Sequence, residues 1–197
     1  FAFSNLAALV NYSATFAIGF LLSLYLQYIK GFAAGAAGLV LIAQPLVMAL
    51  FSPLAGRLSD RHEPRRIASL GMGLSALGLL FFTGLGPSSP LAAIVANLML
   101  VGFGFALFSS PNTNAVMSSV ERRHFGVASA TLGTMRMVGQ MLSMGIATLI
   151  FSLFLGKASI VPARFPLFLR SLRVSFIVFA VLCAAGVLFS LARGRLR

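Results

Sequence analysis

The sequence predicts an all-α membrane protein, with six transmembrane helices in a single domain over residues 1–197. Hydrophobic residues make up 59% of the chain and charged residues 9%, whereas a soluble domain is about one quarter charged. The mean hydropathy is +0.99. The apolar residues form blocks of about twenty or more, the helix length that crosses roughly 30 Å of hydrocarbon. Composition and block length together exclude a soluble globular protein.

Polar turns between the apolar blocks set the limits of each span. The first span ends in a group of aromatic, amide and basic residues that is typical of a membrane interface. Pro45 and Pro53 are expected to kink the second span, and Pro111 to interrupt the fourth. Residues 156–171 mix apolar and basic side chains, and we expect this link to lie along the interface. The expected spans are residues 4–28, 36–57, 67–85, 91–117, 126–154 and 172–191.

Lys and Arg are distributed unequally between the two sides of the membrane. The turns after the second and fourth spans and the C-terminal tail form the more basic side. Because an excess of Lys and Arg marks the cytoplasmic side, we expect both termini to be cytoplasmic. The basic residues of this side are Arg57, Arg61, Arg65, Arg66, Arg122, Arg123, Arg193, Arg195 and Arg197, and those of the other side are Lys30, Lys157, Arg164, Arg170 and Arg173.

The residues that could support other functions lie in the wrong places for them. The net charge of +12 comes from basic residues in the short gaps between spans, as in membrane-flanking anchors, so we expect no nucleic-acid partner. The one cysteine, Cys183, lies inside an apolar block, which favours neither a disulfide nor a metal site. His62 and His124 lie in charged turns, and no serine motif accompanies them. We expect no enzyme, metal or cofactor, and a lipid bilayer as the main partner.

Amides and one guanidinium interrupt the apolar spans, and they are confined to the first, second, fourth and fifth. Polar groups in hydrocarbon need partners or water, so we expect these spans to surround a wet cavity, with the third and sixth facing lipid. Asn11 and Gln44 either line this cavity or join helices. Asn112 and Asn114 either line it or satisfy backbone groups freed by Pro111. The expected cavity residues are Asn11, Gln44, Asn97, Asn112, Asn114, Arg136 and Gln140.

Arg136 is the one basic residue deep inside a span. It lies about ten residues into the fifth span, roughly 15 Å deep at the rise of an α-helix, and it shares one helical face with Gln140 and Ser143. One interpretation is that the guanidinium faces the cavity and binds an anionic or hydrogen-bonding group of a small molecule. The other is that carbonyl groups of a broken neighbouring helix clamp it.

The stretch Gly56-Arg-Leu-Ser-Asp-Arg61 separates the second and third spans and is followed by Arg65 and Arg66. So many charges are costly in hydrocarbon, and we expect a tight polar turn at the membrane face. The stretch resembles the cytoplasmic loop motif of the major facilitator superfamily, although Glu63 and Pro64 depart from the family's pattern.

The resemblance implies a role for each residue of this cytoplasmic gate motif. Gly56 would permit the tight helix end, and Asp60 would form ion pairs and cap a helix dipole. The basic residues Arg61 and Arg65 would hold the inward gate shut. Together with Arg123, Asp60 and Arg61 would form a breakable latch.

Four further motifs resemble the carboxy-terminal half of the fourteen-spanner drug:proton antiporters within this superfamily. They are Asn11-Tyr-Ser-Ala-Thr-Phe16, Tyr25-Leu-Gln-Tyr28, Pro111-Asn-Thr-Asn114 and Gly133-Thr-Met-Arg-Met-Val-Gly-Gln140. The resemblance implies one six-helix half of a transporter that exports drugs or other small molecules, coupled to protons, in a bacterial inner membrane. A stand-alone structural or regulatory six-helix module is the alternative.

The resemblance also implies a partner for this domain. The chain begins with Phe1 rather than Met, and we expect a fragment of a longer protein. Its partner would be a missing amino-terminal half or a second copy of the chain. The three acids of the chain lie in the polar turns, so the spans supply no carboxylate for proton coupling. Either the other half holds that group or coupling works differently.

Overall fold

The structure, a computed structural model, describes residues 1–156 and 160–191. Within these residues every regular element is helical, and six helices are long and apolar enough to span a membrane. The first span is divided into two helices, and so is the second. The helices are α1 Ala2–Thr15, α2 Ile18–Tyr28, α3 Ala34–Leu41, α4 Ala43–Arg61, α5 Pro64–Phe82, α6 Leu91–Ser118, α7 Phe125–Leu155 and α8 Phe165–Leu191, with short 3-10 helices at Arg122–His124 and Pro162–Arg164.

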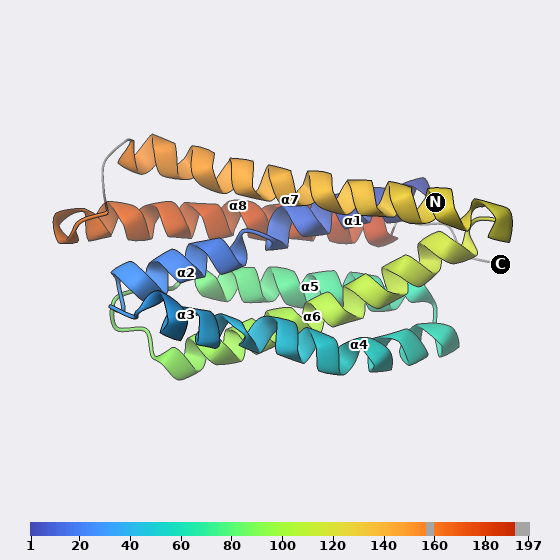
Figure 1. Ribbon diagram of the computed structural model, residues 1–197, viewed down its shortest axis with the longest axis horizontal. Coiled ribbons are helices and arrows are strands. Elements are labelled where there is room, and N and C mark those ends of the chain that lie inside the picture. The colour runs from blue at the N-terminus through green and yellow to red at the C-terminus, as the bar shows by residue number, and fades with distance from the viewer. Residues whose placement is uncertain (157–159, 192–197) are drawn as a thin grey trace.

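The helices form an elongated bundle in which α4 and α7 lie at opposite edges (Figure 1). α5 packs against α6 and α8, α1 packs against α7 and α8, and α4 packs against α6. The α4–α5 and α6–α7 connections lie at the same end of the bundle as the start of α1 (Figure 1). The two charged turns therefore share one end, as the distribution of basic residues predicts. Lys157, Arg193, Arg195 and Arg197 lie outside the described residues.

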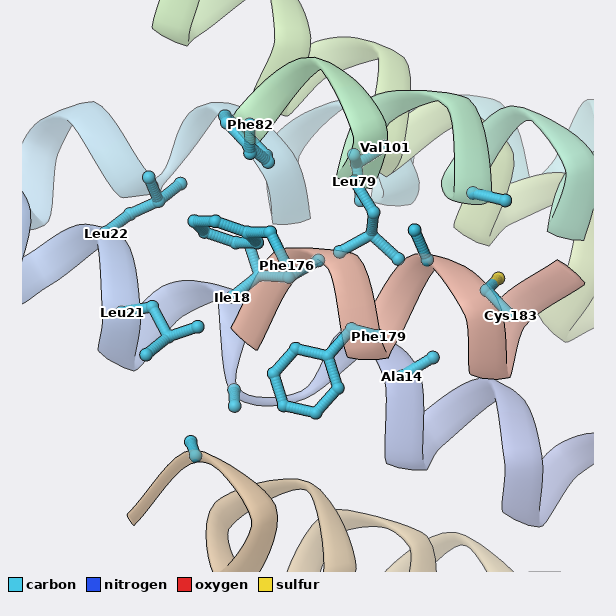
Figure 2. Close-up of a cluster of buried hydrophobic side chains, with 14 of the residues drawn as sticks. Ala14, Ile18, Leu21, Leu22, Leu79, Phe82, Val101, Phe176, Phe179 and Cys183 are labelled. Atoms are coloured by element: carbon cyan, nitrogen blue, oxygen red, sulfur yellow. The ribbon is translucent and has the colours of Figure 1, made fainter. Parts of the chain in front are cut away.

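The apolar core is built where α8 meets α5 and the first span. Phe176 of α8 lies near Leu22 and Phe82, whereas Phe179 points to the side of α8 away from α5 (Figure 2). The Phe176 and Phe82 ring centroids are 5.2 Å apart. The backbones of α5 and α6 approach each other closely at Gly71. A Cβ at this position would lie 2.5 Å from the Gly104 carbonyl oxygen. Small residues of this kind allow helices to associate in lipid through close packing.

The third and sixth spans are more than the lipid-facing supports that their lack of amides predicts. More than half of the third span's most apolar segment is buried (56%), whereas in the second span the share is 6%. α5 and α8 do expose apolar side chains, such as Leu80 and Leu188, on one face. Their other faces form the core of the bundle. Polar content identifies helices that need partners, but it does not measure how much apolar area a helix buries.

The charged stretch after the second span is mostly helical rather than a tight turn. α4 continues to Arg61, and α5 begins at Pro64. Only His62 and Glu63 connect them. Pro64 is favourable in the first turn of α5, because the proline ring presets a helical φ and the missing N–H has no partner there in any helix. Helix ends can therefore hold these charges at the membrane face.

Two further expectations about helix limits are wrong. α6 runs through Pro111 without interruption. The link before the sixth span is shorter than expected, because α8 begins at Phe165 rather than at residue 172. Proline removes one backbone hydrogen bond but does not end a helix whose neighbours hold it in place.

Candidate functional site

Two breaks in the transmembrane helices meet at one place in the bundle. The first span is interrupted at residues 16–17 and the second at Ile42. At the first break the Ala17 N–H donates to the Ser143 Oγ of α7, over 2.9 Å. At the second, Pro45 has no N–H to offer the carbonyl of Leu41, one turn earlier. The backbone keeps right-handed helical φ and ψ at Phe16, Ala17 and Ile42, so each break is a local kink in a continuous span.

A pocket of about 410 Å³ lies between these two breaks and α6. Its volume is within the range of small-molecule sites, roughly 300–1,000 Å³. Aromatic and apolar side chains form most of its wall, and the amide of Gln44 and the hydroxyl groups of Tyr12 and Thr15 supply its polar groups. The lining residues are Tyr12, Thr15, Phe16, Gly19, Leu41, Gln44, Pro45, Met48 and Phe105. The third and sixth spans contribute none of them.

Arg136 of α7 lies behind the wall of this central pocket. Its Nη2 donates to the Thr113 Oγ1 of α6 over 2.7 Å, and its Cζ lies 5.7 Å from the centroid of the Tyr12 ring. Tyr12 in turn meets Phe105 edge-on, with 5.1 Å between ring centroids. Arg136 Nε is buried and has no hydrogen-bond partner among the described residues. The guanidinium thus joins α7 to α6 and α1, and a hydroxyl and an aromatic ring hold it rather than carbonyl groups.

The helical face that carries Arg136 packs against the first span. Ser143 is fully buried beside the break at Ala17. A Cβ on Gly139 would lie 2.6 Å from the Leu9 carbonyl oxygen, so only glycine fits at this crossing. Gln140 is partly buried beside it. This face of α7 is turned toward protein and not toward lipid.

The amides expected in one cavity are distributed over three environments. Gln44 lines the central pocket. Asn11 is fully buried in the core, with its Oδ1 3.9 Å from the Cys183 Sγ. Asn112 is also buried, and neither of its side-chain polar atoms has a partner within the described residues.

The other two amides connect helices. The Asn97 Nδ2 donates to the Gly78 carbonyl of α5 over 2.9 Å, and the side chain lines a second pocket, of about 470 Å³, beside residues 84–90. The Asn114 Nδ2 donates to the Ser59 Oγ of α4 over 2.8 Å. Asn114 is exposed. These bonds brace α6 against its two neighbours and lie apart from the central pocket.

The charged end of the bundle pairs its acids differently from the expected latch. Glu63 bonds Arg65 (2.6 Å) and Arg66 (3.1 Å), and Glu121 bonds Arg123 (2.8 Å). Glu63 also precedes the first residue of α5, where the helix dipole favours a negative charge. The acid at a helix N-terminus is therefore Glu63, although its side chain makes no capping hydrogen bond, and the partner of Arg123 is Glu121.

Asp60 and Arg61 lie exposed in the last turn of α4. With Arg57 and two leucines they line a shallow pocket of about 450 Å³. Gly56 lies inside α4 instead of at its end, and a Cβ there would lie 3.1 Å from the Ser110 Oγ of α6. The absence of a side chain at Gly56 therefore allows α4 and α6 to cross closely.

The expected cavity residues do not include several residues that build the pocket, although two of the quoted motifs contain Tyr12, Phe16 and Thr113. Tyr12, Phe16 and Phe105 form its aromatic wall, and Thr113 holds Arg136. Tyr12 is one turn before Phe16 in the first span, and polar residues lie next to both of them. A search for aromatic residues one turn from polar ones would have found this pair. Phe105 gives no local signal, because it lies in a continuous apolar run.

Comparison with known proteins places the whole bundle in one family. The family model described as Major Facilitator Superfamily matches residues 5–196. The riboflavin transporter RibZ of Clostridioides difficile is 31% identical over 158 residues, which cover 80% of this chain and 34% of that protein.

Two further relatives give the same result. The uncharacterized transporter YebQ of Escherichia coli is 37% identical over 68% of this chain and 29% of its own length. The multidrug resistance protein Stp of Mycobacterium tuberculosis is 28% identical over 62% of this chain and 22% of its own. The chain spans about a third of the length of RibZ and of YebQ. With a family model that matches almost its entire length, the chain belongs to the major facilitator superfamily of membrane transporters.

Proposed function

We propose that this chain is the carboxy-terminal half of a secondary transporter that moves a small molecule by alternating access. The observation that carries the proposal is the meeting of two kinked spans at an aromatic pocket backed by Arg136. Transporters of this architecture bind substrate near the midplane, between two halves that rock against each other. The described helices would move together in that motion.

The exposed edges of the bundle support a second half as the partner. Apolar side chains are exposed along α4, where Leu50 is 67% accessible, and along α7, where Leu153 is 75% accessible. The same two helices carry the polar groups Gln44 and Arg136. A missing amino-terminal half, or a second copy of this chain, would cover these faces and close the pocket from the other side.

We infer efflux of drugs or related small molecules, coupled to protons, as the physiological activity. Relatives named as multidrug, lincomycin and methylenomycin A resistance proteins support drug export, and the relative named as a riboflavin transporter supports a flat aromatic substrate. The three acids of this chain lie at the ends of helices. The other half would therefore supply the protonated carboxylate. Both termini would be cytoplasmic, in a bacterial inner membrane.

The cytoplasmic gate motif would act across the boundary between halves. Asp60 and Arg61 are exposed at the end of α4, where a partner can reach them. We propose that they pair with the second half when the inward gate is closed, while Gly56 keeps α4 tight against α6. Arg65 and Arg123 would tune the charge of this end. Each such exposed pair contributes about 1 kcal/mol or less, which suits a gate that must open.

The experiment that tests this function is transport by the full-length carrier in proteoliposomes, with and without a pH gradient. We expect gradient-dependent movement of a drug-like substrate in the wild type and its loss in the Arg136→Ala variant. The Arg170→Ala variant is the control. Arg170 does not line the pocket, and its Cζ lies 5.9 Å from the centroid of the Phe154 ring. Unchanged transport by the Arg136→Ala variant would contradict the proposed site.

A further inference from the structure

The charge beside the central pocket is not balanced. Arg136 makes one hydrogen bond to a neutral hydroxyl and stacks on a neutral ring, and its buried Nε has no partner within the described residues. The residues that line the pocket include no acid. The three acids of the chain lie at the ends of α4, α5 and the 3-10 helix before α7, and two of them already bind arginines. The guanidinium is therefore a positive charge near the pocket that no acid of the described residues neutralises.

The wall of the same pocket is suited to flat aromatic groups. Tyr12 and Phe105 stand at 89° to each other with centroids 5.1 Å apart, and both line the pocket together with Phe16. Aromatic rings prefer edge-to-face and offset-stacked neighbours of this kind. The Arg136 Cζ lies 5.7 Å from the centroid of the Tyr12 ring, so a ring bound against Tyr12 would lie near a positive charge.

We propose that the central pocket selects planar aromatic anions, such as an aromatic carboxylate, sulfonate or acidic imide, over aromatic cations of the same shape. This inference rests on the proposed transport function and specifies its substrate class. Arg136 acts through its field and through Tyr12, since it does not itself line the pocket. Across about 10 Å at an effective dielectric constant of about 20, one unit charge changes affinity roughly tenfold. The Gln44 amide would orient a carbonyl or acid group at the opposite wall.

The test compares two probes that share a ring system and differ in charge. We would measure equilibrium binding of radiolabelled 2-naphthalenesulfonate and 2-naphthyltrimethylammonium to the full-length carrier in lipid nanodiscs. We expect the wild type to bind the sulfonate at least tenfold more tightly. The preference should disappear in the Arg136→Gln variant, persist in Arg136→Lys and be unchanged in the control variant Arg170→Gln. Binding of both probes should weaken in Tyr12→Leu.

Each outcome decides the inference separately from the transport function. Equal binding of the two probes, or a preference for the ammonium, would overturn the anion selectivity. So would an Arg136→Gln variant that keeps the wild-type preference. If that variant is not recovered as folded protein, the preference of the wild type and of Arg136→Lys decides. A carrier that transports the ammonium probe in preference to the sulfonate would refute the selectivity and leave the transport function intact. A carrier that transports no tested compound would refute the function itself.

Discussion

Arg136 donates from its Nη2 to the Thr113 Oγ1 across 2.7 Å, so the fifth span is tied to the fourth two residues after Pro111. This bond satisfies part of a charge that is costly inside hydrocarbon, by about 2.5–3.5 kcal/mol on insertion scales. It also fixes the guanidinium against the Tyr12 ring. Because Thr113 and Tyr12 belong to different spans, the position of Arg136 depends on how those spans are packed.

Removing the acceptor on Thr113 tests this bond. The Thr113→Val variant keeps the shape of the side chain but loses the hydroxyl, and hydrogen bonds to charged groups contribute about 1.5–3 kcal/mol. We expect a lower melting temperature in detergent and reduced transport. Thr113→Ser retains the hydroxyl and should behave like the wild type. Equal stability of the valine and serine variants would show that Thr113 does not hold Arg136.

The break in the first span depends on Ser143. In the Ser143→Ala variant the Ala17 N–H loses its partner, and an unsatisfied buried donor costs about 1–3 kcal/mol. We expect lower thermal stability and weaker binding at the pocket, because the chain at Phe16 and Ala17 would rearrange to recover a bond.

Thr148→Ala is the matched control for that variant on the same helix. The Thr148 hydroxyl is exposed and bonds only carbonyls of its own helix, so its loss should change little. A Ser143→Ala variant as stable and as active as Thr148→Ala would exclude a role for Ser143 at the break.

The contact of α7 with the first span tolerates no side chain at Gly139. A Cβ there would lie 2.6 Å from the Leu9 carbonyl oxygen and 2.9 Å from the Tyr12 Cβ. Overpacking of this kind typically costs about 1–3 kcal/mol, so the Gly139→Ala variant should melt at a lower temperature and bind substrate less well. Gly145 of the same helix has open space around it, and Gly145→Ala should be neutral or slightly stabilising. Two variants of equal stability would contradict the packing described here.

The Asp60→Asn variant tests the proposed gate. We expect impaired transport with an unchanged amount of protein in the membrane and an unchanged melting temperature, because the described residues give Asp60 no ion pair to lose within this half. Glu63→Gln should differ, since it loses bonds to Arg65 and Arg66 and should lower stability by about 1 kcal/mol or less. Normal transport by Asp60→Asn at physiological salt would reject the gate role.

Much of the fold follows from the sequence because hydrocarbon imposes strict rules. Helix length and the cost of buried charge locate six spans and their charged turns, and these rules depend only on local composition. The break at Ala17 is different, since its partner Ser143 lies 126 residues away and no local pattern reveals it. Pro111 shows the reverse case, in which a strong local signal for an interruption is overridden by the packing of α6.

The candidate site was foreseen in part for the same reason. Arg136 and Gln44 stand out because they are polar in apolar surroundings, and both lie at or behind the pocket. Asn97 and Asn114 stand out equally but brace helices, because an amide that joins helices and an amide that binds a ligand look alike in sequence. The aromatic wall at Phe105 required the tertiary structure.

The central claim, that the two kinked spans enclose a water-accessible site, is tested most directly by cysteine labelling. In a full-length carrier whose other cysteines are serine, a Gln44→Cys variant would be treated with a membrane-impermeant methanethiosulfonate reagent. The reference is Leu188→Cys, at a position that is 69% accessible on the apolar face of α8. The account predicts rapid labelling at position 44, slowed by substrate, and none at position 188. A cysteine at position 44 as unreactive as one at position 188 would contradict it.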